Sequence, residues 1–574
     1  MARDNLVWQV ARHDMEQVKA FARELRVPEP MAGLLLGRGI VNRQQAEAFF
    51  SASLEDLPSP FLMEGMEEAV GVVFKALERN APVLVYGDYD VDGTTGTALL
   101  LLFLRRIGFS EVAACQPHRL KDGYGLHPMV VRRSAPGYGG RKPLLITVDC
   151  GISCADQVRE LRREGWEVVV TDHHLPPSQL PDADAVLDPQ QPGCRYPEKH
   201  LAGVGVAFHL AMAVRSRLRE RRGLRDGGPN LKEFLDLVAM GTVADLVPLT
   251  GVNRILVRTG LEVLAQAPRP GLRELIRLSG IKGRVAGDDI AYRLAPRLNA
   301  AGRLGDADRA LRLLVVEDAE EAARLAVELD EENKRRKQLV SDIEAQVEAA
   351  AEQAVAAGRK GLVLSGDQWH PGVIGIAAAR VADRFRRPTL LFSLQDGRAR
   401  GSGRAAVGVD IHEILNELIH LFIEFGGHKA AVGVTMDEAL LPRLEHEFNQ
   451  RVAAAMTEEM LEPRLDVDWV DRDGQVFSKD FLELYQRMAP FGRGNPEPVL
   501  SVQGYLDEAR IVGGRHLKFS MRTAGSRCDG IGFGLGDVLD GTPLVQPVEA
   551  AFRLRLNTYG KRDTWQMEAL AFSR

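Results

Sequence analysis

Three carboxylates occupy alternate positions in the segment Gly87–Gly93, which reads Gly-Asp-Tyr-Asp-Val-Asp-Gly. Asp88, Asp90 and Asp92 are spaced so that they can converge on a hard cation, because such cations prefer oxygen ligands. The same pattern opens an EF-hand loop, but the twelfth loop position is Leu99, where that loop needs a glutamate. The chain also contains no Gly-x-x-x-x-Gly-Lys-Ser/Thr phosphate loop. The segment therefore predicts a metal site of another kind.

Further side chains that can bind metal follow other apolar runs. They are Asp149, the triplet Asp172-His173-His174, and Asp245. A lone aspartate in such a position is most often a helix cap or a turn residue, and a lone histidine is more often hydrogen-bonded than metal-bound. Carboxylates packed closely together, however, repel one another unless cations neutralise them. We therefore favour a metal centre over separate structural roles.

Mixed carboxylate and imidazole ligands suit Mn²⁺ or Mg²⁺ better than an ion that prefers thiolates. Two such ions about 4 Å apart can bind a phosphate, activate a water and stabilise the leaving oxygen. That chemistry needs no protein nucleophile, and the chain contains no Gly-x-Ser-x-Gly elbow that would supply one. The residues predict a metal-dependent phosphoesterase.

These side chains need a scaffold that brings separate strand ends together. From about residue 80, short apolar runs alternate with amphipathic helical stretches, and the runs are Val83–Tyr86, Val112–Cys115, Leu144–Val148, Val168–Val170 and Ala185–Leu187. Strands that are apolar on both faces and separated by helices indicate a parallel sheet with crossover helices. Ligand sites in such sheets lie beyond the carboxyl ends of the strands, so we expect the candidate ligands to meet in one crevice.

The rest of the chain predicts further parts around this sheet. Residues 1–79 have a helical rhythm and precede the catalytic domain, which we place at 80–305. Residues 306–357 are charged and free of proline, as a solvated connecting helix would be. A second, smaller α/β pattern occupies 358–460, and shorter alternating runs in 461–574 predict a β-barrel.

Composition limits the location and the partners of the protein. The 574 residues carry a net charge of −6, so any nucleic acid must bind in a locally basic groove. No apolar run approaches the roughly 18 residues that span a bilayer, and the amino terminus opens on charged residues. Five cysteines without a Cys-x-x-Cys pair argue against a zinc ribbon or a disulfide framework. We expect a cytoplasmic protein with no membrane association.

Together these motifs resemble the DHH phosphoesterase superfamily and, within it, the RecJ family of single-strand-specific 5′→3′ DNA exonucleases. The Asp-His-His triplet alone is a weak signal, but the ordered set of motifs spans nearly the whole chain. The supporting stretches are His118–Gly125, Gly241–Asp245, Ala295–Arg303, His370–Ile376 and Pro490–Pro498. The resemblance implies an α/β fold with a parallel-sheet DHH domain, a long helix, a smaller α/β DHHA1 domain and a C-terminal OB-like barrel.

The resemblance also implies roles for the matched residues. The ligands of two Mn²⁺ or Mg²⁺ ions would be Asp90, Asp92, Asp149, His173 and Asp245, with Asp149 bridging the ions. Asp88 would ligate a metal or orient the first motif, and His174 would contact the phosphate or tune the attacking water. The catalytic residues would be Asp90, Asp149, His173 and His174.

For the substrate, the resemblance implies arginines that grip the 5′ end and the DNA backbone, because the planar guanidinium can bind phosphate in a bidentate way. The candidates are Arg119, Arg297, Arg303 and Arg404, of which we expect one to form only a salt bridge. The run Gly426-Gly427-His428-Lys429 would let backbone approach a phosphate, although such a glycine pair is as often only a turn. In the barrel the candidates are Arg515, His516, Lys518 and Phe519, the last of which also suits a core position.

The expected function is a 5′→3′ exonuclease that releases 5′-mononucleotides from single-stranded DNA in recombination and repair. The connecting helix would clamp two domains around a channel too narrow for duplex. A phosphoesterase for short oligonucleotides, cyclic dinucleotides or pyrophosphate, and a catalytically dead DNA-binding scaffold, are the alternatives. The C-terminal region disfavours the first, and the presence of every expected ligand disfavours the second. The family suggests a single-strand-binding protein and a recombination helicase as partners, and we expect a monomer.

Overall fold

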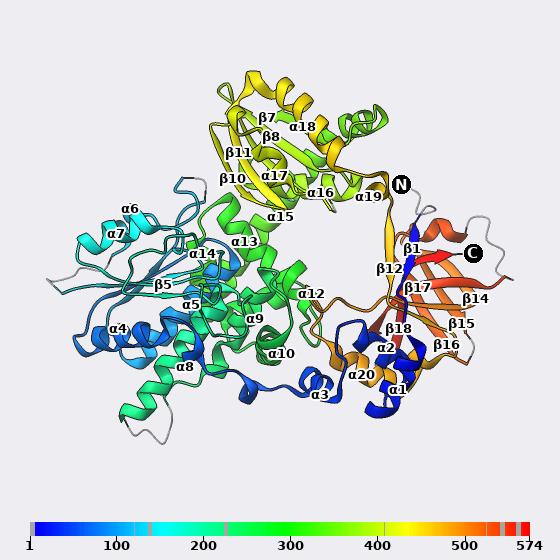
Figure 1. Ribbon diagram of the computed structural model, residues 1–574, viewed down its shortest axis with the longest axis horizontal. Helices are drawn as coiled ribbons and strands as arrows, with labels where there is room; N and C mark the ends of the chain where they lie inside the picture. The colour runs from blue at the N-terminus through cyan, green and yellow to red at the C-terminus, as the bar shows by residue number, and fades with distance from the viewer. Residues whose placement is uncertain are drawn as a thin grey trace.

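The structure is a computed structural model that describes residues 6–119, 121–135, 141–222, 228–406, 408–523, 525–539, 546–557 and 564–573 (Figure 1). In the sequence, the amino terminus opens on charged residues. Those residues, 1–5, lie outside the described residues. No helix in the described parts of the chain combines the length and the apolarity that a bilayer crossing requires.

The catalytic sheet lies at the left of Figure 1 and has five parallel strands in the order β3-β2-β4-β5-β6. Its strands are β2 (Val83–Gly87), β3 (Val112–Cys115), β4 (Leu144–Val148), β5 (Glu167–Thr171) and β6 (Ala185–Leu187). Alternate residues of β2 enter different cores: Val83 and Val85 join one apolar cluster, and Leu84 and Tyr86 join another. Burial on both faces explains why these strands are continuous apolar runs. The predicted parallel sheet is confirmed.

Helices cover both faces of this sheet. The first cluster includes α4 (Met66–Glu78), α5 (Val91–Ile107) and α8 (Gly203–Arg222), and the second includes α6 (Pro128–Ser134) and α7 (Ala155–Arg163). The carboxyl-terminal side of the same lobe is helical. It contains α9 (Leu235–Ala244), α10 (Gly251–Gln266), α11 (Pro270–Leu278), α12 (Gly287–Asp289), the π-helical turn Ile290–Leu294, α13 (Ala295–Leu304) and α14 (Asp308–Val315).

The stretch 306–357, expected to be one connecting helix, contains two helices. Helix α14 ends at Val315, Val316 is extended, and α15 (Ala319–Ala356) begins after the side-chain cap of Asp318. The buried residues of α15 change partners along its length: Leu325 and Leu329 pack into the catalytic core, whereas Val340, Ile343 and Val347 pack into the next lobe. One continuous helix therefore belongs to two cores and links them.

The next lobe, at the top of Figure 1, holds a five-stranded mixed sheet in the order β10-β11-β9-β8-β7. Strands β7 (Leu362–Asp367) and β8 (Thr389–Gln395) are parallel, and β9 (Arg398–Arg404), β11 (Ala431–Asp437) and β10 (Glu424–His428) continue the sheet in antiparallel pairs. Its helices are α16 (Pro371–Phe385), α17 (Ile411–Asn416), α18 (Leu441–Ala455) and α19 (Glu458–Leu461).

The C-terminal lobe is a five-stranded closed barrel, because β14 pairs with both β15 and β17 and completes the order β14-β15-β16-β18-β17. The strands are β14 (Leu500–Val512), β15 (His516–Arg522), β16 (Arg527–Gly532), β17 (Val548–Asn557) and β18 (Thr564–Ser573), with β13 (Trp469–Asp471) beside β14 and α20 (Lys479–Met488) before it. The predicted fold class, an α/β protein with a connecting helix, a smaller α/β domain and an OB-like barrel, is confirmed.

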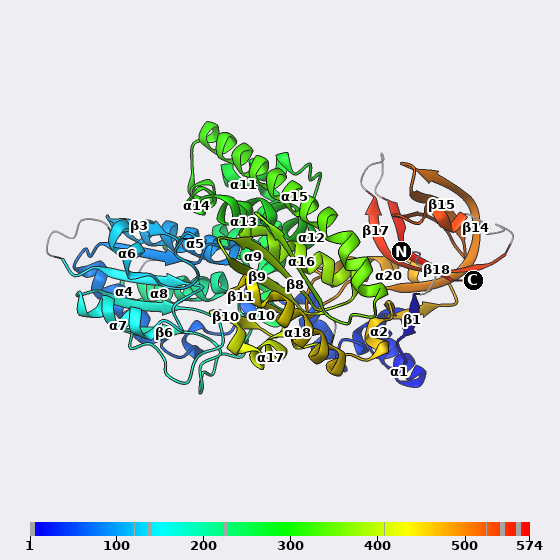
Figure 2. The same ribbon diagram turned by 90° about the horizontal axis from the view of Figure 1, so that it is seen from above.

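The N-terminal segment differs from the helical segment predicted for 1–79. It opens on β1 (Val7–Val10), which pairs in parallel with β12 (Arg464–Val467), and continues with α1 (Met15–Leu25), α2 (Glu29–Leu36) and α3 (Arg43–Ser51). These helices share a core with the barrel, more than 400 residues away in sequence, and both views place them beneath it (Figures 1 and 2). Of the helices α1–α4, α4 packs into the catalytic core, together with Met63 just before it. The sequence does not predict strand β1, because the strand has only four residues and most of them are exposed.

Candidate metal centre

Neighbouring strands of the catalytic sheet end at one edge and deliver the candidate ligands there. Asp88 follows β2, Asp149 follows β4, and Asp172 begins the triplet that follows β5. Because the order is β2-β4-β5, these strand ends are direct neighbours. Asp90 caps α5 by accepting backbone N–H bonds at 2.9 and 3.1 Å, and Asp245 is the C-cap of α9. The candidate ligands therefore meet at the carboxyl-terminal edge of the sheet, as the sequence predicts.

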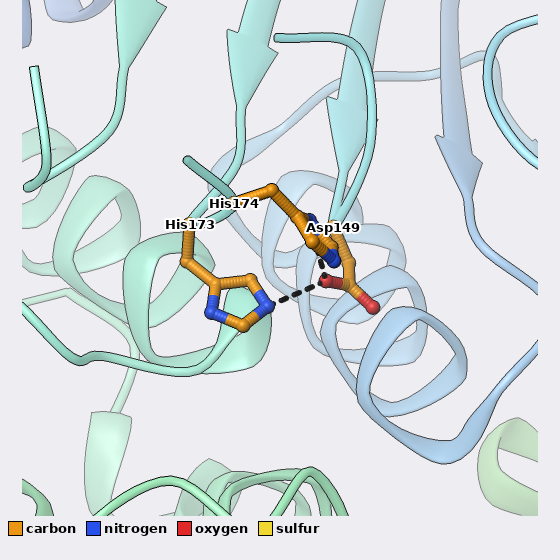
Figure 3. Close-up of side chains that lie close together, drawn as sticks. All are labelled: Asp149, His173 and His174. Carbon is orange, nitrogen blue, oxygen red and sulfur yellow. Dashed lines mark ion pairs between the residues drawn. The ribbon is translucent and has the colours of Figure 1, made fainter. Parts of the chain in front are cut away.

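His173 lies at the centre of the cluster. Its Nε2 atom is 3.0 Å from Oδ1 of Asp149, 3.6 Å from Oδ2 of Asp245 and 3.8 Å from Oδ2 of Asp92. The Nδ1 atom of His174 is 3.9 Å from the same Asp149 oxygen, so both imidazoles point toward one carboxylate (Figure 3).

Buried backbone amides fix the orientation of Asp92. Its two carboxylate oxygens accept hydrogen bonds from the N–H groups of Gly203 at 2.6 Å and Val204 at 2.8 Å, at the start of α8. Gly203 is needed for a second reason, because a Cβ atom there would lie 2.6 Å from Cβ of Asp149. Asp149 itself has φ of +62°, a conformation that costs a non-glycine residue on the order of 1–3 kcal/mol. Backbone hydrogen bonds hold Asp92, and close packing holds Asp149 in its strained conformation.

Asp172 orients the histidine pair instead of facing the cluster. Its Oδ1 atom accepts hydrogen bonds from the backbone N–H of His173 at 2.8 Å and lies 2.7 Å from Nδ1 of His174. Its Oδ2 atom accepts from Ile152 N–H at 2.9 Å. The hydroxyl of Tyr124 lies 3.2 Å from the same imidazole nitrogen. With Nδ1 held by these contacts, the other ring nitrogen of His174 is free to serve a different partner.

Burial and mutual repulsion shift the pKa values of the carboxyl groups upward. Burial, and then Asp245, raises the pKa of Asp92 to about 7, and burial with Asp90 raises that of Asp245 to about 7. Burial also raises the pKa of Asp88 and Asp149 well above the ordinary aspartate value. Burial and like charge therefore favour the protonated forms of these groups, and ionised groups so close together would need positive charge to neutralise them.

The two histidines shift in opposite directions. Burial lowers the pKa of His173, which keeps its imidazole neutral and able to act as a ligand. Burial acts in the same sense on His174, but the hydrogen bond with Asp172 and the surrounding carboxylates outweigh it and raise its pKa to about 9. His174 is therefore a cation at neutral pH, which suits contact with a phosphate better than metal ligation.

The donor set fits divalent cations. Three groups of side chains have ligand atoms within 4.8 Å of one another, and they are Asp149 with His173 and His174, Asp92 with His173 and Asp245, and Asp88 with Asp90 and Asp149. Asp149 and His173 each belong to two groups, as residues between two ions would. Oδ1 of Asp88, Oδ1 of Asp149 and Nε2 of His173 are buried without a hydrogen-bond partner among the described residues. Buried polar atoms are nearly always paired, so three unpaired atoms in one cluster fit the ligands of a divalent cation.

An arginine cluster adjoins this centre. Arg119 lies with its guanidinium carbon 5.0 Å from the centre of the Tyr89 ring and acts electrostatically on Asp88. Arg303 is buried enough, and close enough to Arg119, Arg336 and Arg404, that its pKa falls to about 9. These four arginines come from the β3–α6 loop, α13, α15 and β9, so both lobes joined by α15 contribute.

Arg336 was not among the predicted arginines, and Arg297 was. Arg336 sits in the basic run Lys334–Lys337 of α15, which looks like a solvated helix face, so no pattern singles it out. The Nε atoms of Arg303 and Arg336 are buried without a hydrogen-bond partner among the described residues. Arg297 instead pairs with Asp330 at 2.9 Å, and both side chains are largely buried. It is the predicted arginine that forms a salt bridge.

The remaining predicted substrate residues lie outside this cluster, but the glycine-rich run is close to it in the fold. Ala431 is the strand partner of both His428 and Arg404, and the N–H of Ala405 donates to the carbonyl oxygen of Ala430 at 2.9 Å. Gly426, Gly427, His428 and Lys429 are exposed, at and just beyond the edge strand β10. Gly427 lies in β10 with φ of +144°, and a Cβ atom there would clash with the carbonyl oxygen of Ala431, so the hairpin requires this glycine whatever its role toward phosphate. In the barrel Arg515 and Lys518 are exposed and His516 is partly buried, whereas Phe519 is 3% exposed and belongs to the core. Of the two roles left open for Phe519, the structure shows the core position.

Three family models match the chain. Residues 82–242 match the N-terminal domain of the DHH family, residues 358–454 match the DHHA1 domain, and residues 473–570 match the RecJ OB domain. These ranges fall in the catalytic lobe, the second α/β lobe and the C-terminal lobe of the structure, and the catalytic lobe continues beyond residue 242 to Val315.

Curated relatives and solved structures are similar to this chain over nearly its whole length. The single-stranded-DNA-specific exonuclease RecJ of Dickeya dadantii is 39% identical over 94% of this chain and 96% of its own. RecJ of Bacillus subtilis is 35% identical over 99% of this chain and 71% of its own. The crystal structure of RecJ in complex with Mn²⁺ from Thermus thermophilus gives a TM-score of 0.82 at 33% identity, covering all of this chain and 80% of that one. The Mg²⁺ complex gives a TM-score of 0.74 at 31% identity, over all of this chain and 79% of that one. Similarity at this level, together with the clustered carboxylates and histidines, means that the chain is a metal-dependent exonuclease and belongs to the RecJ family of single-stranded-DNA-specific exonucleases.

Proposed function

We propose that this exonuclease removes 5′-mononucleotides from single-stranded DNA in the 5′→3′ direction, by hydrolysis at two divalent cations, in recombination and repair. The observation that supports the proposal best is the adjacency of two features: a carboxylate–histidine cluster with two shared residues, and an arginine cluster that reaches it through Arg119 and Asp88. The first suits cleavage of a phosphodiester bond, and the second suits retention of a phosphate next to it.

The residues of the cluster divide between two Mn²⁺ or Mg²⁺ ions. We assign Asp88, Asp90 and Asp149 to one ion, and Asp92, Asp245 and His173 to the other, with Asp149 between them. When bound, the ions supply a polarised phosphate, an activated water and a stabilised leaving oxygen. The chain orients the ligands through the amides of Gly203 and Val204. His174, held by Asp172 and cationic at neutral pH, donates a hydrogen bond from its other nitrogen to a phosphate oxygen.

The arginine cluster supports recognition of a strand end. A terminal phosphate carries close to two negative charges at neutral pH, and an internal phosphodiester carries one. Arg119, Arg303, Arg336 and Arg404 gather positive charge in excess of what one internal phosphate would neutralise. The Nη1 atom of Arg404 also donates to Oγ of Ser402 at 2.9 Å, which aims the guanidinium. We assign the 5′-phosphate to this cluster, and Arg336 takes the place first given to Arg297.

The proposal is tested with single-stranded DNA labelled at the 5′ end or the 3′ end, incubated with Mn²⁺, with Mg²⁺ or with a chelator. Immediate release of mononucleotide from the 5′ label, only with metal, is the expected result. Release from the 3′ label would overturn the polarity. Hydrolysis of di- and trinucleotides without attack on long strands would overturn the polymer substrate and favour a small-molecule phosphoesterase.

A second comparison tests the role of the arginines. Strands that begin with a 5′-phosphate should be degraded faster than the same strands with a 5′-hydroxyl group. The variant Arg404→Ala should lose this preference, whereas Arg400→Ala, an exposed arginine on the same strand β9, should keep it. Equal preference in both variants would remove Arg404 from the phosphate site.

A further inference from the structure

The motif Pro490–Pro498 precedes the barrel strands and has no part in the chemistry described so far. Its centre is a buried asparagine. The Nδ2 atom of Asn495 donates to the carbonyl oxygens of Met488 and Pro490, both at 2.9 Å, and its Oδ1 atom accepts from Nε of Arg38 at 3.1 Å. Asn495 is 1% exposed. The loop is therefore held in one conformation by a side chain that satisfies its own backbone.

The same loop is anchored to the catalytic lobe by Arg254 of α10. Its guanidinium donates to the carbonyl oxygens of Met488 at 2.8 Å and Arg487 at 2.9 Å, and its Nε atom donates to that of Phe49 at 3.1 Å. Arg254 is 5% exposed, so these bonds are protected from water. The catalytic lobe, the N-terminal helices and the segment before the barrel are thus joined at one point.

From this anchored loop, contacts reach the turn between α9 and α10, which begins with Asp245. The backbone N–H of Leu249 donates to the carbonyl oxygen of Arg493 at 2.7 Å. Gly494 packs so closely on the turn that a Cβ atom there would lie 3.0 Å from Cβ of Pro248, and a Cβ atom on Gly492 would lie 2.7 Å from Leu249. The loop and the turn are therefore packed tightly against each other at these two glycines.

The guanidinium of Arg493 reaches the other end of the turn. Its Nη1 atom donates to the carbonyl oxygen of Leu246 at 3.4 Å. Leu246 is the residue after Asp245 and has φ of +59°, a strained value for a leucine, while its side chain is 61% exposed. Strain of this kind persists only where neighbouring groups enforce it. The N–H of Leu246 donates to the carbonyl oxygen of Val243 at 3.3 Å, as at many helix ends, and Arg493 adds a contact from outside the catalytic lobe.

We propose that the segment 490–497 positions Asp245 in the metal centre, with Arg493 as a positioning residue, so that the region before the barrel sets the affinity for one of the two cations. This inference rests on the proposed function, because it takes Asp245 to be a metal ligand. The motif then links the C-terminal half of the chain to catalysis through geometry, in addition to any contact of the barrel with DNA.

Charge and position make opposite predictions for the loss of Arg493. Its positive charge opposes a nearby cation, so charge alone predicts tighter metal binding in Arg493→Ala. The side chain is exposed and its field is screened by water, so the electrostatic gain is small. Loss of a group that orients a metal ligand typically weakens metal affinity about 10- to 100-fold. We therefore expect the positional effect to dominate.

The experiment measures Mn²⁺ binding to the full-length protein by calorimetry in the absence of DNA. Arg493→Ala should weaken the affinity of one site about tenfold, and Arg493→Lys, which can still donate to the Leu246 carbonyl, should recover part of it. Gly494→Ala should also weaken that site, because its new Cβ pushes the turn at Pro248 without any change of charge. Arg472→Ala, an exposed arginine elsewhere in the C-terminal region, should bind as the wild type does.

A kinetic readout separates positioning from general damage. At saturating Mn²⁺, kcat of Arg493→Ala should return to within about twofold of the wild type, whereas the Mn²⁺ concentration for half-maximal rate should rise in step with the binding constant. A variant that is merely misfolded would lose kcat at every Mn²⁺ concentration.

The variant Asp245→Ala distinguishes a failure of the proposed metal centre from a failure of the proposed positioning role. If Asp245→Ala binds two Mn²⁺ ions like the wild type, the assignment of Asp245 as a ligand is wrong and the proposed function must be revised. If Asp245→Ala loses one ion while Arg493→Ala and Gly494→Ala bind both normally, the metal centre stands and the positioning role of the motif is overturned.

Discussion

Nε2 of His173 and Oδ1 of Asp149 lie 3.0 Å apart, yet neither atom has a hydrogen-bond partner among the described residues. Two buried atoms this close together and without partners fit the ligands of a shared cation. Asp149 has a strained φ, and the close packing of Gly203 against its Cβ helps to enforce that conformation. The metal centre thus depends on where these side chains are held as well as on their donor atoms.

The variant Asp149→Asn should lose at least about a thousandfold in turnover, equivalent to about 4 kcal/mol of transition-state stabilisation. The side chain keeps its size but loses the charge that two cations share. The metal-free variant should unfold at a higher temperature than the metal-free wild type, because burial disfavours the ionised carboxylate. Activity assays and thermal unfolding with chelator check both results. Asp156→Asn, exposed on α7, is the matched control, and a comparable loss of turnover there would contradict the assignment.

Metal binding should release protons at mildly acidic pH. The pKa of Asp92 and that of Asp245 rise from 3.8 to about 7 in the metal-free fold, so both groups hold protons at pH 6 and must lose them to bind a cation. Calorimetry of Mn²⁺ binding in buffers of different ionisation enthalpy should show more protons released at pH 6 than at pH 8.5. Equal release at both values would mean that the groups are already ionised.

The same shifts fix how the stability of the metal-free protein depends on pH. The folded state holds these protons up to about pH 7, and the unfolded chain loses them near 3.8. The folded state therefore binds more protons between about pH 4 and 7, and its stability should fall as pH rises through that window. Saturating Mn²⁺ should flatten this dependence in denaturant titrations.

Arg336→Gln should raise KM for strands with a 5′-phosphate about tenfold and change KM for 5′-hydroxyl strands little. Removal of one charge-assisted hydrogen bond to a phosphate costs about 1.5–3 kcal/mol, which corresponds to a factor of ten or more. Steady-state kinetics on the two kinds of strand measure the ratio. Arg324→Gln, exposed on the same helix α15, is the control, and a similar change in both variants would indicate a general charge effect.

Arg297→Gln should behave differently, because Arg297 is engaged with Asp330. The change leaves Asp330 with Lys334 as its remaining partner, so stability should fall by about 2 kcal/mol, less than the cost of a fully broken buried pair. The preference for a 5′-phosphate should persist. Denaturant unfolding and the two-strand assay report these effects separately, and a lost preference at normal stability would return Arg297 to the substrate site.

The sequence predicts the catalytic sheet well, because strands buried on both faces and followed by metal-capable residues leave few other arrangements. It predicts less where the signal is tertiary. Arg336 is one of several basic residues on a charged helix, and only the fold places it beside Arg303. Arg297 sits in a matched motif, but its partner Asp330 is 33 residues away on another helix. Strand β1 and the packing of α1–α3 on the barrel depend on residues more than 400 positions distant, which no local pattern reveals.

This long-range packing gives the last prediction, which concerns truncation. Deletion of 462–574 alone would uncover the apolar residues by which α1 and α2 contact the barrel, among them Phe21, Leu34 and Leu35. Large exposed apolar patches promote aggregation, so this variant should be insoluble. Deletion of 1–52 together with 462–574 removes both halves of that core and leaves the catalytic cluster and the α15 cluster intact. The double deletion should be soluble, and sedimentation measures the difference.

The double deletion should still cleave short oligonucleotides in saturating Mn²⁺, because the candidate ligands all lie within 88–245. It should need about tenfold more Mn²⁺ than the full chain, since Arg493 and its loop are gone, and it should bind long single strands weakly for want of the barrel. A double deletion that matches the full chain on long strands would show that the barrel contributes nothing to the substrate. One that matches it in Mn²⁺ requirement would show that Asp245 holds its position without help from the C-terminal region.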